Sequence, residues 1–136
     1  MIKHTPFQAV YKAVYDILST KQSTVVYSAI PTNADYPCIT MGNSFSFLYN
    51  GAKNVDIADV TLYIDIWSAD TSAKEIQEIC DEVRAVLTSW QLEFDPADYC
   101  AMDQDIPEGI IQQEYDEPWV YHALLTFKAK IQYIGG

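Results

Sequence analysis

The residue types that most often carry out catalysis are few and scattered in this chain. Its two histidines, His4 and His122, lie near opposite ends of the sequence, and His122 falls on the polar face of an alternating segment. Motifs that indicate catalysis or ligand binding set reactive groups or ligands at fixed offsets in the sequence. None of the GxSxG, HExxH, glycine-rich phosphate-loop or EF-hand patterns occurs here. We therefore expect two surface histidines, no catalytic residue and no enzyme activity.

Metal-binding patterns are equally sparse. The cysteines are odd in number and widely spaced, without a CxxC or Cys/His cluster: Cys38, Cys80 and Cys100. This spacing disfavours a zinc site and fits free thiols in a reducing compartment. The acidic pairs Asp95/Asp98 and Asp103/Asp105 do not supply the six to eight oxygens that calcium takes. We expect no metal and no cofactor.

Charge and length narrow the class of protein further. The chain has 136 residues, 49% of them apolar, which suits one globular domain over residues 1–136. A net charge of −11 repels phosphate backbones, so sequence-specific nucleic-acid binding is not expected. Lys12 and Asp16 interrupt the N-terminal apolar pattern, and no apolar run is long enough for a bilayer. We expect a protein made in the cytosol, without a membrane partner.

Two segments have helical periodicity. Thr5-Pro6-Phe7-Gln8 reads as a capped helix start, and the apolar residues of the following turns recur at helical spacing up to Leu18. A second helix is predicted after Ser72 and Glu75, which form a capping-box pattern. Its apolar stripe comprises Ile76, Ile79, Cys80, Val83, Val86, Leu87 and Trp90.

Strand patterns occupy most of the remaining chain. In residues 60–67 aliphatic side chains alternate with a mixed set that includes Asp65, so the aliphatic side is predicted to face the core. Further strands are predicted at 24–30, 37–42, 99–105, 109–115 and 121–134, while 45–49 fits either a strand or an aromatic loop. The order favours an α+β fold: a mostly antiparallel sheet with two helices packed on one face.

Asp65 raises a question about the sheet's second face, because it lies between Tyr63 and Trp67. One interpretation is a carboxylate hydrogen-bonded at the sheet surface. The other is a polar interface group flanked by aromatic anchors, which are enriched where proteins touch. The predicted interface residues are Phe45, Phe47, Tyr49, Tyr63, Asp65 and Trp67.

Five segments in order resemble a known family: "VYSAIP", "YPCITMG", "VTLYIDIWS", "ICDEVRAVL" and "LLTFKAKI". Together they are similar to the tail-completion and tail-terminator (head–tail joining) proteins of long-tailed phages and prophages, over about residues 9–131. The resemblance implies a structural virion protein at the tail–head junction, assembled in the host cytoplasm. It would form a ring, typically hexameric, that caps the tail tube and docks to the head connector or adaptor proteins. The Ile30–Tyr36 loop would then be a presented surface.

A ring through which DNA passes suggests where the charges lie. Acidic walls would let DNA pass without holding it, and the candidates are Glu75, Glu78, Asp81, Glu82, Asp103 and Asp105. Lys128 and Lys130 would then face subunit or partner contacts. The competing interpretation puts these acids on the outer surface. A different class also stays open, namely a small cytosolic ligand-binding domain or an enzyme without a recognisable motif, which would need a pocket with converging polar groups.

Overall fold

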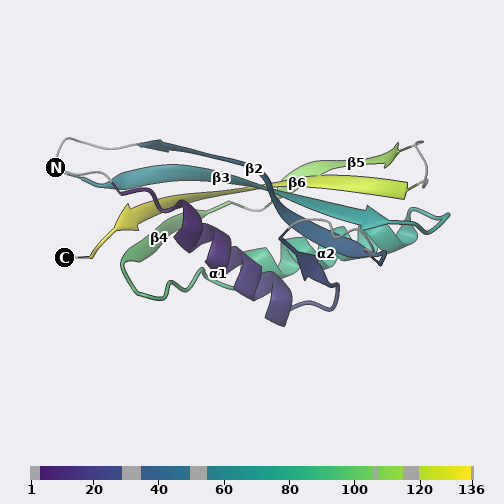
Figure 1. Ribbon diagram of the computed structural model, residues 1–136, viewed down its shortest axis with the longest axis horizontal. Helices are drawn as coiled ribbons and strands as arrows, with labels where there is room; N and C mark the ends of the chain where they lie inside the picture. The colour runs from purple at the N-terminus through teal and green to yellow at the C-terminus, as the bar shows by residue number, and fades with distance from the viewer. Residues whose placement is uncertain (1–3, 29–34, 50–54, 106, 115–119, 136) are drawn as a thin grey trace.

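The computed structural model describes residues 4–28, 35–49, 55–105, 107–114 and 120–135 of the chain. Among these residues it has two helices and a six-stranded sheet (Figure 1). In chain order the elements are α1 (Phe7–Thr20), β1 (Val26–Tyr27), β2 (Cys38–Tyr49), β3 (Ile57–Ser68), α2 (Lys74–Ser89), β4 (Tyr99–Gln104), β5 (Glu108–Glu114) and β6 (Val120–Tyr133). The predicted α+β class is confirmed.

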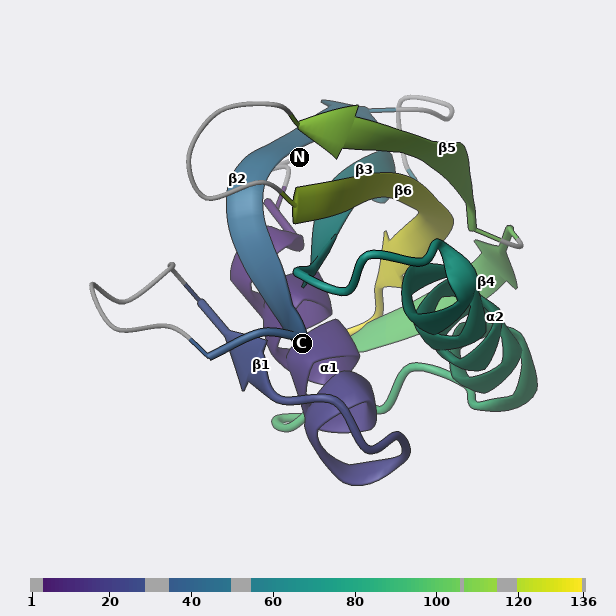
Figure 2. The ribbon, with the colours of Figure 1, turned by 90° about the vertical axis from the view of Figure 1, so that its right-hand side faces the viewer.

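The sheet is antiparallel except at one edge. Its strands run in the order β1-β2-β3-β6, and among the described strand pairs only β1–β2 is parallel. Beyond β6, β4 pairs with the C-terminal half of that strand and β5 with its N-terminal half. Seen end-on, the sheet arches over the two helices, which contact each other beneath it (Figure 2). Both helices therefore cover the same face, as the sequence predicts.

The hydrophobic core lies between that face and the helices. Val60, Leu62, Ile64 and Ile66 of β3 are all buried, and they belong to one cluster with the apolar sides of α1 and α2. Phe127 at the centre of β6 is fully buried in the same cluster. The alternation in the sequence thus identified the inward side of β3 correctly, because residues two apart on a strand share a face.

Both helix starts differ from the predicted capping boxes. α1 begins after Pro6 without a side-chain cap, and the Thr5 hydroxyl lies 3.2 Å from the Tyr49 hydroxyl instead. At α2, the Ser72 hydroxyl accepts a hydrogen bond from the Lys74 amide, while the Glu75 carboxylate accepts one from Ser68 (2.7 Å). The capping boxes do not form, because Thr5 and Glu75 have partners elsewhere in the chain, while Ser72 accepts from the amide two residues away.

The end of α2 also departs from its predicted stripe. Trp90 lies just beyond the helix with an extended backbone, and its side chain is 46% exposed. The Lys21 ammonium stands 4.1 Å from the centre of its indole ring. Trp90 is therefore a surface residue, because the helical periodicity that placed it in the core stops at Ser89.

The strand predictions were mostly confirmed. Residues 45–49 continue β2 as a strand, and β2 pairs with β3 in antiparallel orientation. Of the described part of the predicted first strand, residues 24–28, only Val26–Tyr27 is paired. Most of the predicted Ile30–Tyr36 loop lies outside the described residues. No helix of the described chain combines the length and apolarity that crossing a bilayer requires.

Candidate interaction surface

The polar centre of the sheet's second face is a pair formed by β3 and β6. Asp65 is only 4% exposed, and its Oδ1 lies 2.6 Å from Nε2 of His122, so the ring nitrogen donates to the carboxylate. A buried carboxylate is costly unless hydrogen-bonded. Asp65 therefore has a partner within its own chain, as the first interpretation proposes. A place in a subunit interface stays a prediction.

Trp67 lies beside this pair. Its indole stacks on the His122 ring with 3.9 Å between centroids and 2° between planes, and its Nε1 donates to the Thr40 hydroxyl over 3.1 Å. Thr40 is fully buried, so the hydrogen bond satisfies a group that water does not reach. Trp67, which is half-buried, is held in one orientation by contacts on two neighbouring strands.

The remaining predicted aromatic residues are spread over β2 and β3. Tyr63 is half-buried and pairs in register with Thr126, and Tyr49 is 39% exposed at the end of β2. In backbone register Phe45 pairs with Leu62 and Phe47 with Val60; their side chains lie outside what the structure describes. Tyr49 and Trp67 therefore lie near opposite ends of the β2–β3 pair rather than in one patch.

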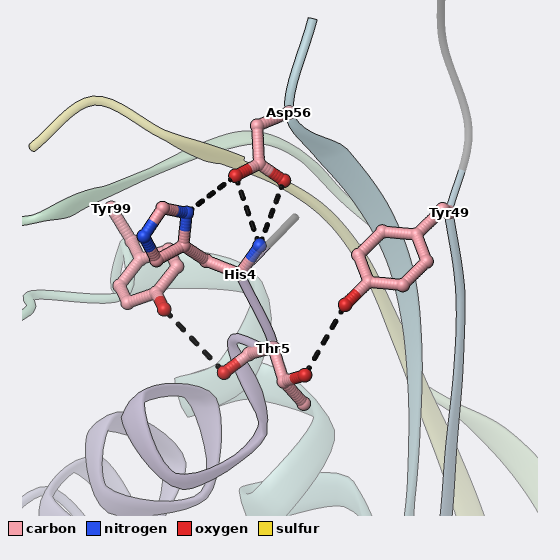
Figure 3. Close-up of polar contacts among 5 residues, drawn as sticks. All are labelled: His4, Thr5, Tyr49, Asp56 and Tyr99. Atoms are coloured by element: carbon pink, nitrogen blue, oxygen red, sulfur yellow. Dashed lines mark hydrogen bonds and ion pairs between the residues drawn. The ribbon is translucent and has the colours of Figure 1, made fainter. Parts of the chain in front are cut away.

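A second histidine–aspartate cluster ties the start of the chain to the end of the sheet (Figure 3). The His4 amide donates to both carboxylate oxygens of Asp56 (3.0 and 3.3 Å), and Nδ1 of its ring lies 2.7 Å from Oδ2. The His4 ring stacks on Tyr133 at 3.5 Å. Asp56 is 8% exposed and precedes β3, so this cluster and the Asp65–His122 pair lie toward opposite ends of the β3–β6 pair.

Tyrosines surround this second cluster. Tyr49 and Tyr99 reach Thr5 from two sides, the Tyr99 hydroxyl donating to the Thr5 carbonyl over 3.4 Å (Figure 3). Tyr99 also meets Tyr133 edge-on at 5.4 Å. Burial, and after it the charge of Asp56, raises the pKa of the Tyr99 phenol above its ordinary value. The phenol therefore stays neutral and able to donate at physiological pH.

The two predicted interface lysines lie on the face opposite the helices. Lys128 is exposed and Lys130 half-buried, and neither forms an ion pair with a described residue. They line a hollow of about 310 Å³ together with Asp59, Asp103 and Asp105. The lysines thus share one surface with Asp103 and Asp105, which the charge argument assigned to a channel wall rather than to the partner contacts predicted for the lysines.

The six predicted channel acids fall into two groups. Glu75, Glu78, Asp81 and Glu82 belong to α2, on the helix side of the sheet, whereas Asp103 and Asp105 lie beside Lys128. In the α2 group, Glu82 accepts a hydrogen bond from the Ser23 amide (3.1 Å), and Glu78 forms an exposed ion pair with Lys74. The two groups approach each other at the sheet edge, because Glu108 and Gly109 line one hollow with Asp81 and another with Asp105. Which of the six acids face a channel stays a prediction.

Some contacts at these surfaces escaped the sequence analysis. Each histidine was assigned to the surface as a lone side chain, but each has a carboxylate partner more than fifty residues away. Alternation did place Asp65 and His122 on compatible faces of their strands, and that was the one available signal. No group of three or more described metal-ligand side chains could hold an ion.

The fold is α+β, a sheet with two helices on one face, and a family comparison shows which class of protein has it. The family model "Tail completion protein gp17" matches residues 8–132, nearly the whole chain. The protein belongs to this tail-completion family and is a structural protein of phage tails. The resemblance noted in the sequence is thereby confirmed.

A solved structure has the same fold. A chain in "Virion of native gene transfer agent (GTA) particle" superposes with a TM-score of 0.73 at 15% sequence identity, covering 96% of this protein and 99% of that chain. A comparison with curated proteins found no match. The two chains therefore share one fold over nearly their whole lengths.

Proposed function

We propose that this protein forms a hexameric ring that caps the finished tail tube and docks to the head connector. The observation that carries the proposal is the tail-completion match over residues 8–132. Its partners would be further copies of itself, the tail tube protein and the connector or adaptor proteins of the head. The ring would assemble in the host cytoplasm and remain at the tail–head junction of the virion.

The surface of the subunit is suited to such contacts. Large apolar or aromatic side chains stay exposed on several elements, among them Leu48 (69%), Tyr49 (39%) and Ile110 (59%). Side chains of this kind are enriched in interfaces, and a monomer would leave them in water. Contacts between two different patches generate a closed ring when the rotation between subunits closes.

The channel of the ring would be lined by some of the six acids. In one arrangement these are the α2 acids, and in a second they are Asp103 and Asp105. An acidic wall would repel DNA and release no counterions that favour binding. In the second arrangement Lys128 and Lys130 would also approach the channel, whereas in the first they would be free to meet a partner.

A complementation experiment tests this role. Particles produced without the protein should accumulate filled heads and finished tails that do not join, and the wild-type gene supplied in trans should restore joined particles. Electron microscopy of the tails should show the cap missing from one end. Normal yields of joined particles in the absence of the protein would refute the proposed function.

A further inference from the structure

Strands β1 and β5 are edge strands of the sheet, and the same rows of register partners run from one to the other. Two rows of paired residues cross five strands from β1 to β5: Val26–Ile39–Ile66–Ala123–Ile111 and Tyr27–Thr40–Asp65–Leu124–Ile110. In the described part of the chain, β1 pairs only with β2 and β5 only with β6. Strands β1 and β5 therefore terminate the same rows on opposite sides of the subunit.

The two edges are only partly protected against pairing with other chains. Natural edges are usually protected by short strands, charges, prolines or bulges. β1 is short, with two residues, and β5 has a glutamate at each end, Glu108 and Glu114. The sequence has no charge from Gln22 to Tyr27 and none from Gly109 to Gln113, and neither stretch contains proline. Instead, Val25 is 45% exposed and Ile110 is 59% exposed. An edge whose central residues are uncharged and partly apolar is a template for strand addition.

The charge of the subunit indicates which partner fits these edges. Two copies at −11 each repel one another, so they can approach closely only where acids are absent. The edge residues of the aligned rows are uncharged and include β-branched types that favour strands, since the acids of β5 stand only at its ends, Glu108 and Glu114. A second copy of this chain can therefore join at these rows without placing acidic side chains at the centre of the contact.

We propose that β5 of one subunit pairs with β1 of the next, so that the sheet continues across the subunit boundary. Across the sheet β1 and β2 run in the same direction, and each of the next three pairs, β2–β3, β3–β6 and β6–β5, is antiparallel. Within one subunit β5 therefore runs opposite to β1. A neighbour that keeps the same strand direction thus meets β5 in antiparallel orientation, the more stable kind of pairing. The two surfaces differ, so the contact is heterologous and can close into a ring. This inference rests on the ring of the proposed function.

Site-directed cross-linking tests the pairing. In a Cys100→Ser background, where the remaining Cys38 and Cys80 are buried, Val25→Cys and Ile110→Cys are made singly and mixed. A short bis-maleimide should join the two variants to each other, at least tenfold more than either to itself. Met102→Cys, exposed on β4, replaces Ile110→Cys as the matched control and should give no product.

The same reaction in assembled particles separates this inference from the function. Joined particles in which Val25→Cys and Ile110→Cys give no cross-link would overturn the strand pairing while leaving the proposed function intact. Cross-linking of Ile110→Cys to itself would also overturn it, because that product requires two β5 edges to meet. Failure of the wild-type gene to restore joining would instead refute the function.

An edge-blocking variant gives an independent measure. Ile110→Lys puts a charge on the β5 edge and should raise the dissociation constant of self-association at least tenfold, with an unchanged melting temperature. Met102→Lys adds the same charge on β4 and should leave association unaltered. Equal association of Ile110→Lys and wild type, by light scattering and by yield of joined particles, would contradict the proposal.

Discussion

The placement of α2 over β3 can be tested by putting a charge into their contact. Ile79 is 6% exposed and belongs to the core cluster. Truncating a buried isoleucine to alanine costs about 2–5 kcal/mol, and an unpaired carboxylate at the same site adds a desolvation penalty. Ile79→Asp should therefore cost more than about 4 kcal/mol, a large part of the roughly 5–15 kcal/mol that stabilises a typical domain.

The expected shift in melting temperature follows from the length of the chain. An unfolding entropy of about 2.1 cal/mol/K per residue gives about 0.3 kcal/mol/K for this protein. A loss of about 4 kcal/mol then lowers Tm by about 14 °C. Ile79→Ala should fall by roughly 7–17 °C, and Ile79→Asp should melt at least as low or fail to fold.

Circular dichroism melting at neutral pH measures these shifts. Gln77→Asp is the matched control, because it adds the same charge to the same helix at an exposed position. Surface changes of this kind stay within about 0.5 kcal/mol, so its Tm should change by less than about 2 °C. An Ile79→Asp variant that melts within a few degrees of wild type would refute the packing of α2 against the sheet.

Three further outcomes follow from single contacts. A Cβ on Gly109 would lie 1.8 Å from the Leu124 carbonyl oxygen, so Gly109→Ala should displace the start of β5. Faster amide exchange in β5 would show the displacement, and unchanged protection would contradict it. Asp65→Ala leaves His122 without its carboxylate and should cost about 1.5–3 kcal/mol, measured by urea unfolding; a smaller loss than that of an exposed Asp→Ala change would argue against the pair. Burial raises the pKa of the Cys80 thiol from its ordinary 9.0 to about 11. The unfolded chain therefore loses its thiol proton first, so stability should fall as pH rises from 9 to 11. Cys80→Ala should reduce that fall, and an identical pH profile in both proteins would show that Cys80 does not cause it.

Much of the fold was readable from local patterns. Helical periodicity located α1 and α2, and alternation in residues 60–67 identified which side of β3 faces the core, because burying one face imposes a period of 3.6 or 2 on apolar residues. The order of five segments along the chain was enough to indicate the tail-completion family. These features depend on near neighbours and on chain order, which the sequence contains directly.

Other features depended on which distant segments meet. His4 joins Asp56, and His122 joins Asp65, only because strand pairing brings residues more than fifty positions apart within hydrogen-bond distance. Trp90 fits the apolar stripe of α2, but it is exposed since the helix ends one residue earlier.

The distribution of charge and the alignment of the two sheet edges were likewise decided by tertiary structure. Composition determined a net charge of −11, but only the tertiary structure places Asp103 and Asp105 beside Lys128 and the other four acids on α2. Register, which sums pairings across five strands, places β1 and β5 at the ends of the same rows. Local propensity does not encode the register between strands that are far apart in the chain. That register results from burying one common face of the sheet against both helices.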